Sequence, residues 1–262
     1  MSLSYDIIGS IAIVKPGKLS GKELKKEAKQ LLKQKNIKTI LLKTSKFQGR
    51  LRKIKTKFLA GIKTKETIYR ENSCLFKLDI DKTYFSPRLS NERLEIANML
   101  KKQKKKNILV MFAGIAPFSI IISKFNPQAN ICSIELNKIA SKYAIENVKL
   151  NRLKNIKTIQ GDVKKIKQII KKQKLPEKYD AIIMPRAQLP CTFLKEAFSV
   201  AGKNCLIIFY DFLKQDEFPD KSLKAIQEEA KKSKRKIKVL NYKRGIEIAP
   251  YKFRSRFDFK IL

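Results

Sequence analysis

The pattern of apolar and polar positions changes near residue 107, and this change divides the chain into two parts. From there on, strand-like apolar runs alternate with stretches whose apolar residues recur at helical spacing. The strand-like runs are NILVMF, NICSIEL, IKTIQGD, YDAIIMP and NCLIIFYDF. Apolar strands that alternate with helices are typical of a parallel sheet covered on both faces. The C-terminal segments KIKVLNYKRGIEI and YKFRSRFDFKIL predict two more strands.

The residues before this point predict a small α+β unit. The segment SYDIIGSIAIVK alternates around a central glycine as a bent pair of strands would, and GKELKKEAKQLLKQ has the spacing of a helix with one buried face. We therefore predict a small basic domain over residues 1–82 and an α/β domain over residues 83–262. In SPRLSNERLEIANML we expect a helix with Ser90 or Asn91 as N-cap and Glu92 in the first turn.

The charge of the chain indicates a polyanionic partner. Its 262 residues include 60 Lys and Arg against 23 Asp and Glu, a formal net charge of +37, while 43% hydrophobic residues suffice for a sizeable core. Such a surplus attracts nucleic acid, and an anionic membrane surface is the main alternative. The chain has neither a long apolar run nor the pattern of a signal peptide, so we expect a cytoplasmic protein without a membrane span.

The cysteines and histidines narrow the chemistry further. The four cysteines are far apart in the sequence and the chain has no histidine, so we expect no metal site and reduced, mostly buried thiols. The commonest general base in enzymes is therefore missing. Any proton transfer has to use Asp, Glu, Lys, Tyr or Cys.

Four features follow predicted parallel strands in order: the loop 113–118, Glu135, Asp162 and the segment MPRAQLP. Ligands of open α/β sheets bind at the carboxyl ends of strands, where these features should meet. Glu135 could accept hydrogen bonds from two ribose hydroxyls and Asp162 from an adenine amino group, while Gly114 lets backbone approach the ligand. This set suits S-adenosylmethionine better than NAD or ATP. Taken singly, each has a structural explanation: Gly114 as an ordinary turn, Asp162 as a helix cap and Glu135 as a solvated strand end.

Several segments resemble the archaeal and eukaryotic tRNA (guanine-37-N1)-methyltransferase family. They are YFSPRLSNER, MFAGIAPFSI, SIELN, AIENVKLNRL and GDV, and the similarity extends over nearly the whole chain. The resemblance implies a class I S-adenosylmethionine-dependent methyltransferase domain, Rossmann-like with a seven-stranded sheet and an antiparallel seventh strand, preceded by a small α+β RNA-binding domain. Larger members carry a further N-terminal domain, which we expect to be absent from this chain. The implied cofactor is S-adenosyl-L-methionine and the implied partner is the anticodon stem-loop of tRNA, and we expect a monomer.

The resemblance also implies roles for individual residues. Glu92 matches the general base, and Arg52, by approximate register, an arginine that contacts guanine O6. The implied substrate contacts are Tyr84, Arg88 and Arg186. The implied cofactor contacts are Arg93, Phe112, Ala113, Gly114, Pro117, Phe118, Glu135, Leu136, Asp162, Val163 and Pro185. These roles agree with the chemistry, because guanine N1 carries a proton at neutral pH and O6 gains negative charge as that proton leaves. Structural explanations stay open: a helix-start acid for Glu92, phosphate contacts for Arg88 and Arg93, and a core position for Tyr84.

The sequence departs from the family pattern at two places. Val110 stands where an acid commonly precedes the loop, and MPRAQLP lacks the usual asparagine. A related archaeal branch also differs there and methylates both guanosine and the wyosine precursor 4-demethylwyosine at C7, so the departures are compatible with both substrates. Two alternatives stay open: an aminocarboxypropyltransferase of wyosine biosynthesis and a non-catalytic RNA-binding protein. In each case we expect residues 1 to about 80 and the C-terminal YKFRSRF to grip the RNA.

Overall fold

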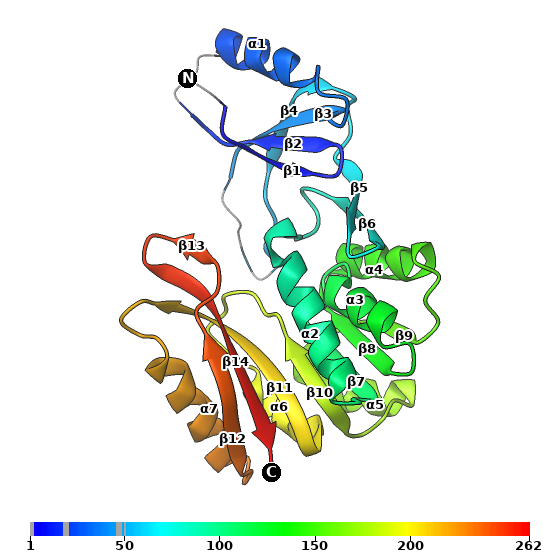
Figure 1. Cartoon of the computed structure of the whole chain (residues 1–262), viewed down its shortest axis with the longest axis vertical. Helices are drawn as coiled ribbons and strands as arrows, with labels where there is room; N and C mark the ends of the chain where they lie inside the picture. The colour runs from blue at the N-terminus through cyan, green and yellow to red at the C-terminus, as the bar shows by residue number, and fades with distance from the viewer. Residues whose placement is uncertain (1–2, 18–20, 46–48, 50) are drawn as a thin grey trace.

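The N-terminal part of the chain is a four-stranded sheet with one helix packed on it (Figure 1). The structure, a computed structural model, describes residues 3–17, 21–45, 49 and 51–262. The elements are β1 (Tyr5–Ile8), β2 (Ile11–Val14), α1 (Gly21–Leu31), β3 (Thr39–Lys43) and β4 (Thr56–Gly61). Ala28 and Leu31 of α1 pack against Ala12, Val14 and Ile40 of the sheet. The predicted strand pair and basic helix are therefore confirmed.

A two-stranded hairpin, β5 (Glu66–Glu71) and β6 (Cys74–Asp79), lies between the small sheet and the rest of the molecule. The backbone N–H of Ser10 donates to Thr67 Oγ1 (2.9 Å), which connects the β1–β2 turn to the hairpin. In that turn Gly9 has φ +58°, and a Cβ there would lie 2.2 Å from the same Thr67 oxygen. On its other side the hairpin is bound by two asparagine side chains of the large domain. Because it contacts both neighbours, the domain boundary at residue 82 stays a prediction.

The larger part is built on an eight-stranded sheet. Its strands are β7 (Asn107–Met111), β8 (Asn130–Glu135), β9 (Ile156–Gln160), β10 (Tyr179–Met184), β11 (Ala201–Lys214), β12 (Ile237–Lys243), β13 (Glu247–Ala249) and β14 (Lys252–Ile261). The order is β12-β14-β11-β10-β7-β8-β9, with the short β13 paired to β14. Strands β7 to β11 are mutually parallel, and β14 runs antiparallel between β11 and β12. The expected seven-stranded sheet with an antiparallel seventh strand is confirmed, and β13 is an addition to it.

Helices cover both faces of this sheet. They are α2 (Ser90–Lys102), α3 (Pro117–Phe125), α4 (Lys138–Leu150), α5 (Ile166–Gln173), α6 (Leu194–Val200) and α7 (Asp220–Lys232). Ile108 and Val110 of β7 belong to the core shared with α2, α3 and α4, whereas Leu109 and Met111 belong to the core shared with α5, α6 and α7. Alternate residues of a strand point to opposite faces, so a continuous apolar run fills both cores.

The start of α2 differs from the expectation. A short 3-10 turn, η1 (Pro87–Leu89), precedes the helix, and Leu89 occupies the N-cap position without a side-chain hydrogen bond. Ser90 and Asn91 lie inside the helix, so the prediction that one of them is the N-cap was wrong. The reason is that Pro87 starts the helical turn earlier, as its fixed φ allows. The side chain of Asn72 instead donates to Ser90.

Candidate active site

An open pocket lies at the carboxyl ends of β7, β8, β9 and β10, and encloses about 650 Å³ including its mouth. Nine of the predicted site residues line it: Arg52, Tyr84, Phe112, Gly114, Glu135, Leu136, Asp162, Val163 and Pro185. Ala187 and Leu189 of the predicted segment MPRAQLP also line it, and residues not singled out from the sequence complete the lining: Leu51, Ile134, Asn137, Ala140 and Gly161. Because parallel strands end at one edge of the sheet, residues far apart in the chain meet here.

The loop between β7 and α3 turns sharply around this edge. Phe112, Gly114 and Ala116 all have positive φ values, of 58°, 58° and 66°. Such values are uncommon outside glycine and persist only where surrounding contacts enforce them. Here the N–H of Ala113 donates to Ile134 O (3.0 Å), and the Phe112 ring packs edge-on against Phe193. The loop therefore has a defined shape beside the pocket.

Glu135 is oriented by two backbone amides. Its Oε2 accepts from Gly114 N (2.7 Å) and its Oε1 from Asn137 N (2.6 Å). A carboxylate has about four acceptor positions, and these two amide donors fix the direction in which it points. Asn137 in turn is the N-cap of α4 and accepts from the N–H of Ile139 at 3.0 Å. The carboxylate is thus held at the tip of β8, where a ligand can reach it.

Asp162 both caps a helical turn and lines the pocket, which are the two roles that its place in the sequence suggests. Its Oδ1 accepts from Lys164 N (3.0 Å), which makes Asp162 the N-cap of the short turn η2 (Val163–Lys165). It also lines the pocket, next to Gly161 and the buried Val163. A cap fixes the side chain close to the strand end. The capping role therefore places a second carboxylate at the pocket.

Arg52 and Tyr84 form another part of the lining. The guanidinium carbon of Arg52 lies 3.8 Å from the centre of the Tyr84 ring, the distance of a cation–π stack. Burial lowers the pKa of Arg52 from its ordinary value, and the neighbouring Tyr84 opposes that shift. Arg52 has a positive φ of 49°. The structure therefore brings an arginine and an aromatic ring together beside the two carboxylates.

Arg186 lies behind the pocket wall. Its side chain is 3% exposed and its donors are bonded within the protein. Nε donates to Tyr210 O (3.0 Å), Nη1 donates to the carbonyls of Leu189 (3.0 Å) and Cys191 (3.2 Å), and Nη2 pairs with Asp211. Burial lowers its pKa, and the Asp211 carboxylate opposes the shift. The guanidinium thus shapes the loop after β10, from which Pro185 and Leu189 reach the pocket.

Glu92 has a partner that the sequence did not suggest. Its Oε2 lies 2.7 Å from Nη1 of Arg254, whose guanidinium carbon is 3.6 Å from the centre of the Tyr210 ring. Tyr210 is fully buried, and burial raises its pKa well above the ordinary value, with Arg254 lowering it and Glu92 raising it. Glu92 does not line the pocket described above. It lies at the start of α2, where its carboxylate faces the Arg254 side chain of β14.

The remaining predicted residues lie outside the pocket lining. Arg93 is buried and forms a two-pronged ion pair with Glu71, at 2.5 and 2.6 Å. Arg88 pairs with Asp6 at the surface (3.2 Å). Pro117 and Phe118 form the first turn of α3, and the preceding Ala113 is buried in the loop.

The expectation that YKFRSRF grips RNA was wrong for its arginines. Arg254 and Arg256 are buried, and Arg256 is paired with Glu95 (2.8 Å) and Asp258 (2.7 Å). The cause is that Glu92 and Glu95 of α2 lie against this face of β14 and pair with Arg254 and Arg256. The two arginines of this strand therefore have partners inside the protein.

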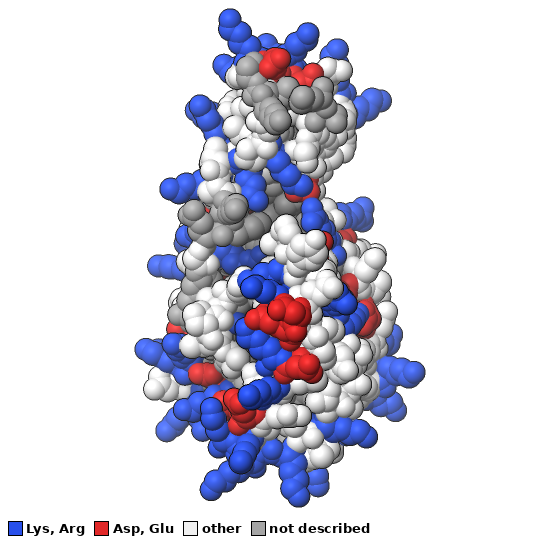
Figure 2. Space-filling view, turned by 90° about the vertical axis from the view of Figure 1, so that its left-hand side faces the viewer, with Lys and Arg blue, Asp and Glu red and all other residues white. Residues whose placement is uncertain are grey.

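The surface is strongly basic. In Figure 2, Lys and Arg side chains cover both the upper and the lower part of the face in view, with a few acidic side chains between them. Within residues 3–17, 21–45, 49 and 51–262, no helix is long and apolar enough to cross a membrane. The same described residues contain no group of three or more His, Cys, Asp or Glu side chains arranged to hold a metal ion.

Comparisons of the sequence and of the fold with known proteins match the same group of tRNA-modifying enzymes. The model of the TRM5/TYW2 methyltransferase domain matches residues 67–240. The chain is 35% identical over 261 residues to a Pyrococcus abyssi protein named tRNA (guanine(37)-N(1))-methyltransferase Trm5b, a match that covers 98% of this chain and 74% of that protein. It is 42% identical over 202 residues to a Nanoarchaeum equitans protein named tRNA (guanine(37)-N(1))/4-demethylwyosine(37)-methyltransferase Taw22, a match that covers 75% of this chain and 66% of that protein. A solved complex of aTrm5 and tRNALeu superposes with a TM-score of 0.82 at 29% identity, over 100% of this chain and 72% of that one.

Proposed function

Since this chain belongs to the TRM5/TYW2 methyltransferase family, we propose that it transfers a methyl group from S-adenosylmethionine to N1 of guanosine 37 in tRNA. The observation that carries the proposal is the composition of the pocket. Two carboxylates and a glycine turn at the strand ends lie beside a stacked arginine and tyrosine. The first group suits a nucleoside cofactor, and the second suits a purine base.

The cofactor would be held by Glu135, Gly114 and Asp162. The fit rests on the two oriented carboxylates, which can accept hydrogen bonds from ribose hydroxyls and an adenine amino group. Apolar lining from Phe112, Ile134 and Val163 suits the faces of the adenine ring. When bound, S-adenosylmethionine supplies an electrophilic methyl group on its sulfonium sulfur.

Arg52 and Tyr84 are proposed to receive the target base. The base has to leave its stack in the RNA, and Tyr84 and Pro185 offer faces against which it can pack. Negative charge develops on O6 as the N1 proton leaves. A guanidinium partly withdrawn from water stabilises that charge more strongly than one in bulk water. Arg52 is the pocket arginine that can supply this donor.

Glu92 is proposed to accept the N1 proton. Its Oε2 forms an ion pair with Arg254 at 2.7 Å, and a carboxylate held in place in this way can serve as a general base. S-adenosylmethionine held by Glu135, Gly114 and Asp162 would supply the methyl group to guanine N1, and Glu92 would take the proton that N1 gives up. The base would have to approach the start of α2, next to the segment YFSPR, which carries Tyr84 and Arg88. Arg186 and Arg93 are proposed to position neighbouring segments, because their donors are bonded within the protein.

A second substrate, 4-demethylwyosine, is supported by the loop after β10. Pro185, Ala187 and Leu189 present apolar side chains to the pocket. An apolar wall accommodates a larger tricyclic ring without leaving an amide unpaired. The relative from Nanoarchaeum equitans is named for both reactions. We therefore propose methylation of this intermediate at C7 as a second activity.

Mass spectrometry of tRNA nucleosides tests the proposal. Transcribed tRNA and tRNA carrying 4-demethylwyosine are incubated with the protein and S-adenosylmethionine, and the same tRNA with adenosine at position 37 is the control. We expect 1-methylguanosine from the first and a methylated product from the second. An aminocarboxypropyl adduct would instead identify the alternative transferase. Cofactor and tRNA binding without any product would identify a non-catalytic RNA-binding protein.

We further propose that the protein acts as a cytoplasmic monomer with domains over residues 1–82 and 83–262. Cys74, Cys132 and Cys205 are buried free thiols, which suits a reducing compartment. The cluster beside α1 belongs to the small sheet and the cluster beside α5, α6 and α7 to the large sheet, which supports the division, while a third cluster spans both.

A further inference from the structure

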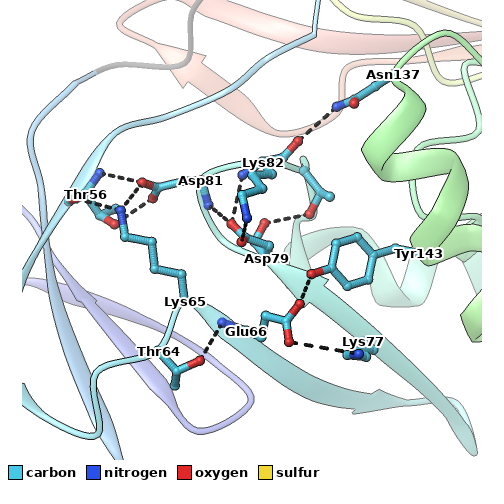
Figure 3. Close-up of polar contacts among 11 residues, drawn as sticks. Thr56, Thr64, Lys65, Glu66, Lys77, Asp79, Asp81, Lys82, Asn137 and Tyr143 are labelled. Atoms are coloured by element: carbon cyan, nitrogen blue, oxygen red, sulfur yellow. Dashed lines mark hydrogen bonds and ion pairs between the residues drawn. The ribbon is translucent and has the colours of Figure 1, made fainter.

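We propose that Asp81 is a positioning residue that holds Arg52 over the pocket, an inference that rests on the proposed function of that pocket. Arg52 and Tyr84 come from two separate segments of the chain. Arg52 lies shortly before β4, and Tyr84 lies shortly after β6. These two segments are joined by the Asp81 cluster, which consists of Thr56, Lys65 and Asp81 (Figure 3).

Both carboxylate oxygens of Asp81 bind the segment that carries Arg52. Oδ1 accepts from Thr56 Oγ1 (2.6 Å), and Oδ2 accepts from Thr56 N (3.3 Å). Lys65 forms an ion pair with the same carboxylate and donates to Thr56 O (3.1 Å). Thr56 is buried and Asp81 is about one-fifth exposed, so water competes weakly for the bonds between these two residues. Charge-assisted bonds of this kind are stronger than neutral ones.

The turn that carries Asp81 is itself fixed to the cofactor side of the pocket. Asp79 Oδ1 accepts from Asp81 N (2.9 Å) and Lys82 N (3.0 Å). Asn137 Nδ2 donates to Lys82 O (2.9 Å), as Figure 3 shows, and the backbone N–H of Asn137 donates to Glu135. A continuous chain of hydrogen bonds therefore runs from the Arg52 segment to the carboxylate proposed to bind ribose.

Arg52 needs such support because its own conformation is costly. Its backbone has φ +49°, and its guanidinium is largely withdrawn from water against Tyr84. Unusual backbone angles persist only where surrounding contacts enforce them. The neighbouring Lys55 bonds to Thr44 and Ser45, which join the segment to the small sheet. The bonds of Asp81 join it instead to the turn that leads into Tyr84.

The test compares Asp81→Ala with a matched control, Asp180→Ala. Asp180 also accepts two backbone N–H groups, from Lys106 (3.1 Å) and Asn107 (2.9 Å), but at the opposite end of β7. We expect Asp81→Ala to lower the single-turnover rate of methyl transfer by about 10- to 100-fold, the usual effect of a small misplacement. Affinity for S-adenosylmethionine should stay within about twofold in both variants, because neither changes its contacts. An equal loss of rate in the two variants would overturn the proposal.

Arg52→Ala separates positioning from general support of the fold. If Asp81 acts through Arg52, then Asp81→Ala should lower the rate of the Arg52→Ala protein by less than about threefold. A full additional loss in that background would overturn the proposal. Should Asp81→Ala fail to fold, Thr56→Val removes the hydroxyl bond and should lower the rate, while Thr56→Ser keeps the bond and should retain it. Equal rates for these two variants would also count against it.

Hydrogen–deuterium exchange distinguishes failure of this inference from failure of the proposed function. In Asp81→Ala, or in Thr56→Val if that protein is used, we expect faster exchange in peptides covering 56–61 and 79–84, and no change for Asp180→Ala. This readout does not depend on catalysis. A wild-type protein that leaves guanosine 37 unmodified would disprove the proposed function, and unchanged exchange in those peptides would disprove the positioning role.

Discussion

At the scale of single residues, cofactor binding should depend most directly on Glu135. Replacement by alanine removes the proposed bonds to ribose and leaves the N–H groups of Gly114 and Asn137 without their carboxylate. We expect the affinity for S-adenosylmethionine to fall by about 1.5–3 kcal/mol, or about 10- to 150-fold, as measured by calorimetry. Glu146→Ala is the control, because that carboxylate is on α4 but faces solvent. An unchanged affinity for Glu135→Ala would remove Glu135 from the site.

Glu92→Gln tests the proposed base. Glutamine keeps the shape of the side chain but cannot accept the N1 proton. We expect tRNA and cofactor binding to persist, while single-turnover methyl transfer falls by about 10²- to 10⁴-fold. Glu95→Gln is the control, because Glu95 lies on the same helix and also pairs with an arginine, Arg256. If Glu92→Gln transfers methyl as fast as the wild type between about pH 6 and pH 9, Glu92 serves only as a helix-start acid.

Whether a site residue could be identified from the sequence depends on whether its position follows from a local pattern or only from the tertiary fold. Glu135 and Asp162 could be placed from the sequence, because each directly follows a strand of a parallel sheet. The pair of Glu92 and Arg254 could not, because the two residues are 162 positions apart. Composition reveals an excess of arginine and lysine but not which side chains are buried. Arg186 was assigned to the substrate from the family resemblance, and Arg254 to the RNA as part of YKFRSRF, but both have partners within the protein.

At the scale of elements, the ion pair of Glu71 and Arg93 joins the end of β5 to α2. Both side chains are at most 2% exposed and the pair is bidentate. Removal of one partner leaves a buried charge without compensation. We expect Glu71→Gln to lower the free energy of unfolding by about 3–5 kcal/mol in urea titrations. Glu146→Gln, whose partner Lys77 is in solvent, should cost less than about 1 kcal/mol. An equal loss of unfolding free energy in the two variants would show that the buried pair adds little to stability.

The order of strands and helices could be read from hydrophobic periodicity, whereas their ends could not. The alternation of buried strands with helices depends on apolar spacing, which is a local property of the sequence. The segment KIKVLNYKRGIEI was taken as one strand but forms β12 and β13. At Gly245 between them, a Cβ would lie 2.2 Å from the carbonyl oxygen of Arg254, so the backbone passes close to β14 there. That close approach exists only in the folded sheet.

At the scale of the whole molecule, one core cluster links two lobes, which are the small sheet with α1 and the large sheet with its helices. It includes Ile11 and Leu41 of the small sheet, Phe76 of the hairpin, and Ile108 of the large sheet. Buried contacts that are continuous across a junction resist movement of one lobe against the other. The basic surface of the small sheet is therefore held at a defined place relative to the pocket. This arrangement suits an enzyme that must grip RNA and position one of its bases at the same time.

The net charge of +37 predicts that tRNA binding depends on salt. Each phosphate that lysine or arginine neutralises releases counterions, so affinity for tRNA should fall steeply with salt. With about six phosphates contacted, the logarithm of the association constant should fall with the logarithm of salt at a slope near −5, about 10³-fold between roughly 50 and 200 mM. Fluorescence anisotropy with labelled tRNA measures this. S-adenosylmethionine affinity in the same buffers is the control and should change by less than about threefold, because its contacts lie within the pocket. A flat response for tRNA would mean that the lysines of the two domains do not engage phosphate and that contacts in the pocket hold the RNA.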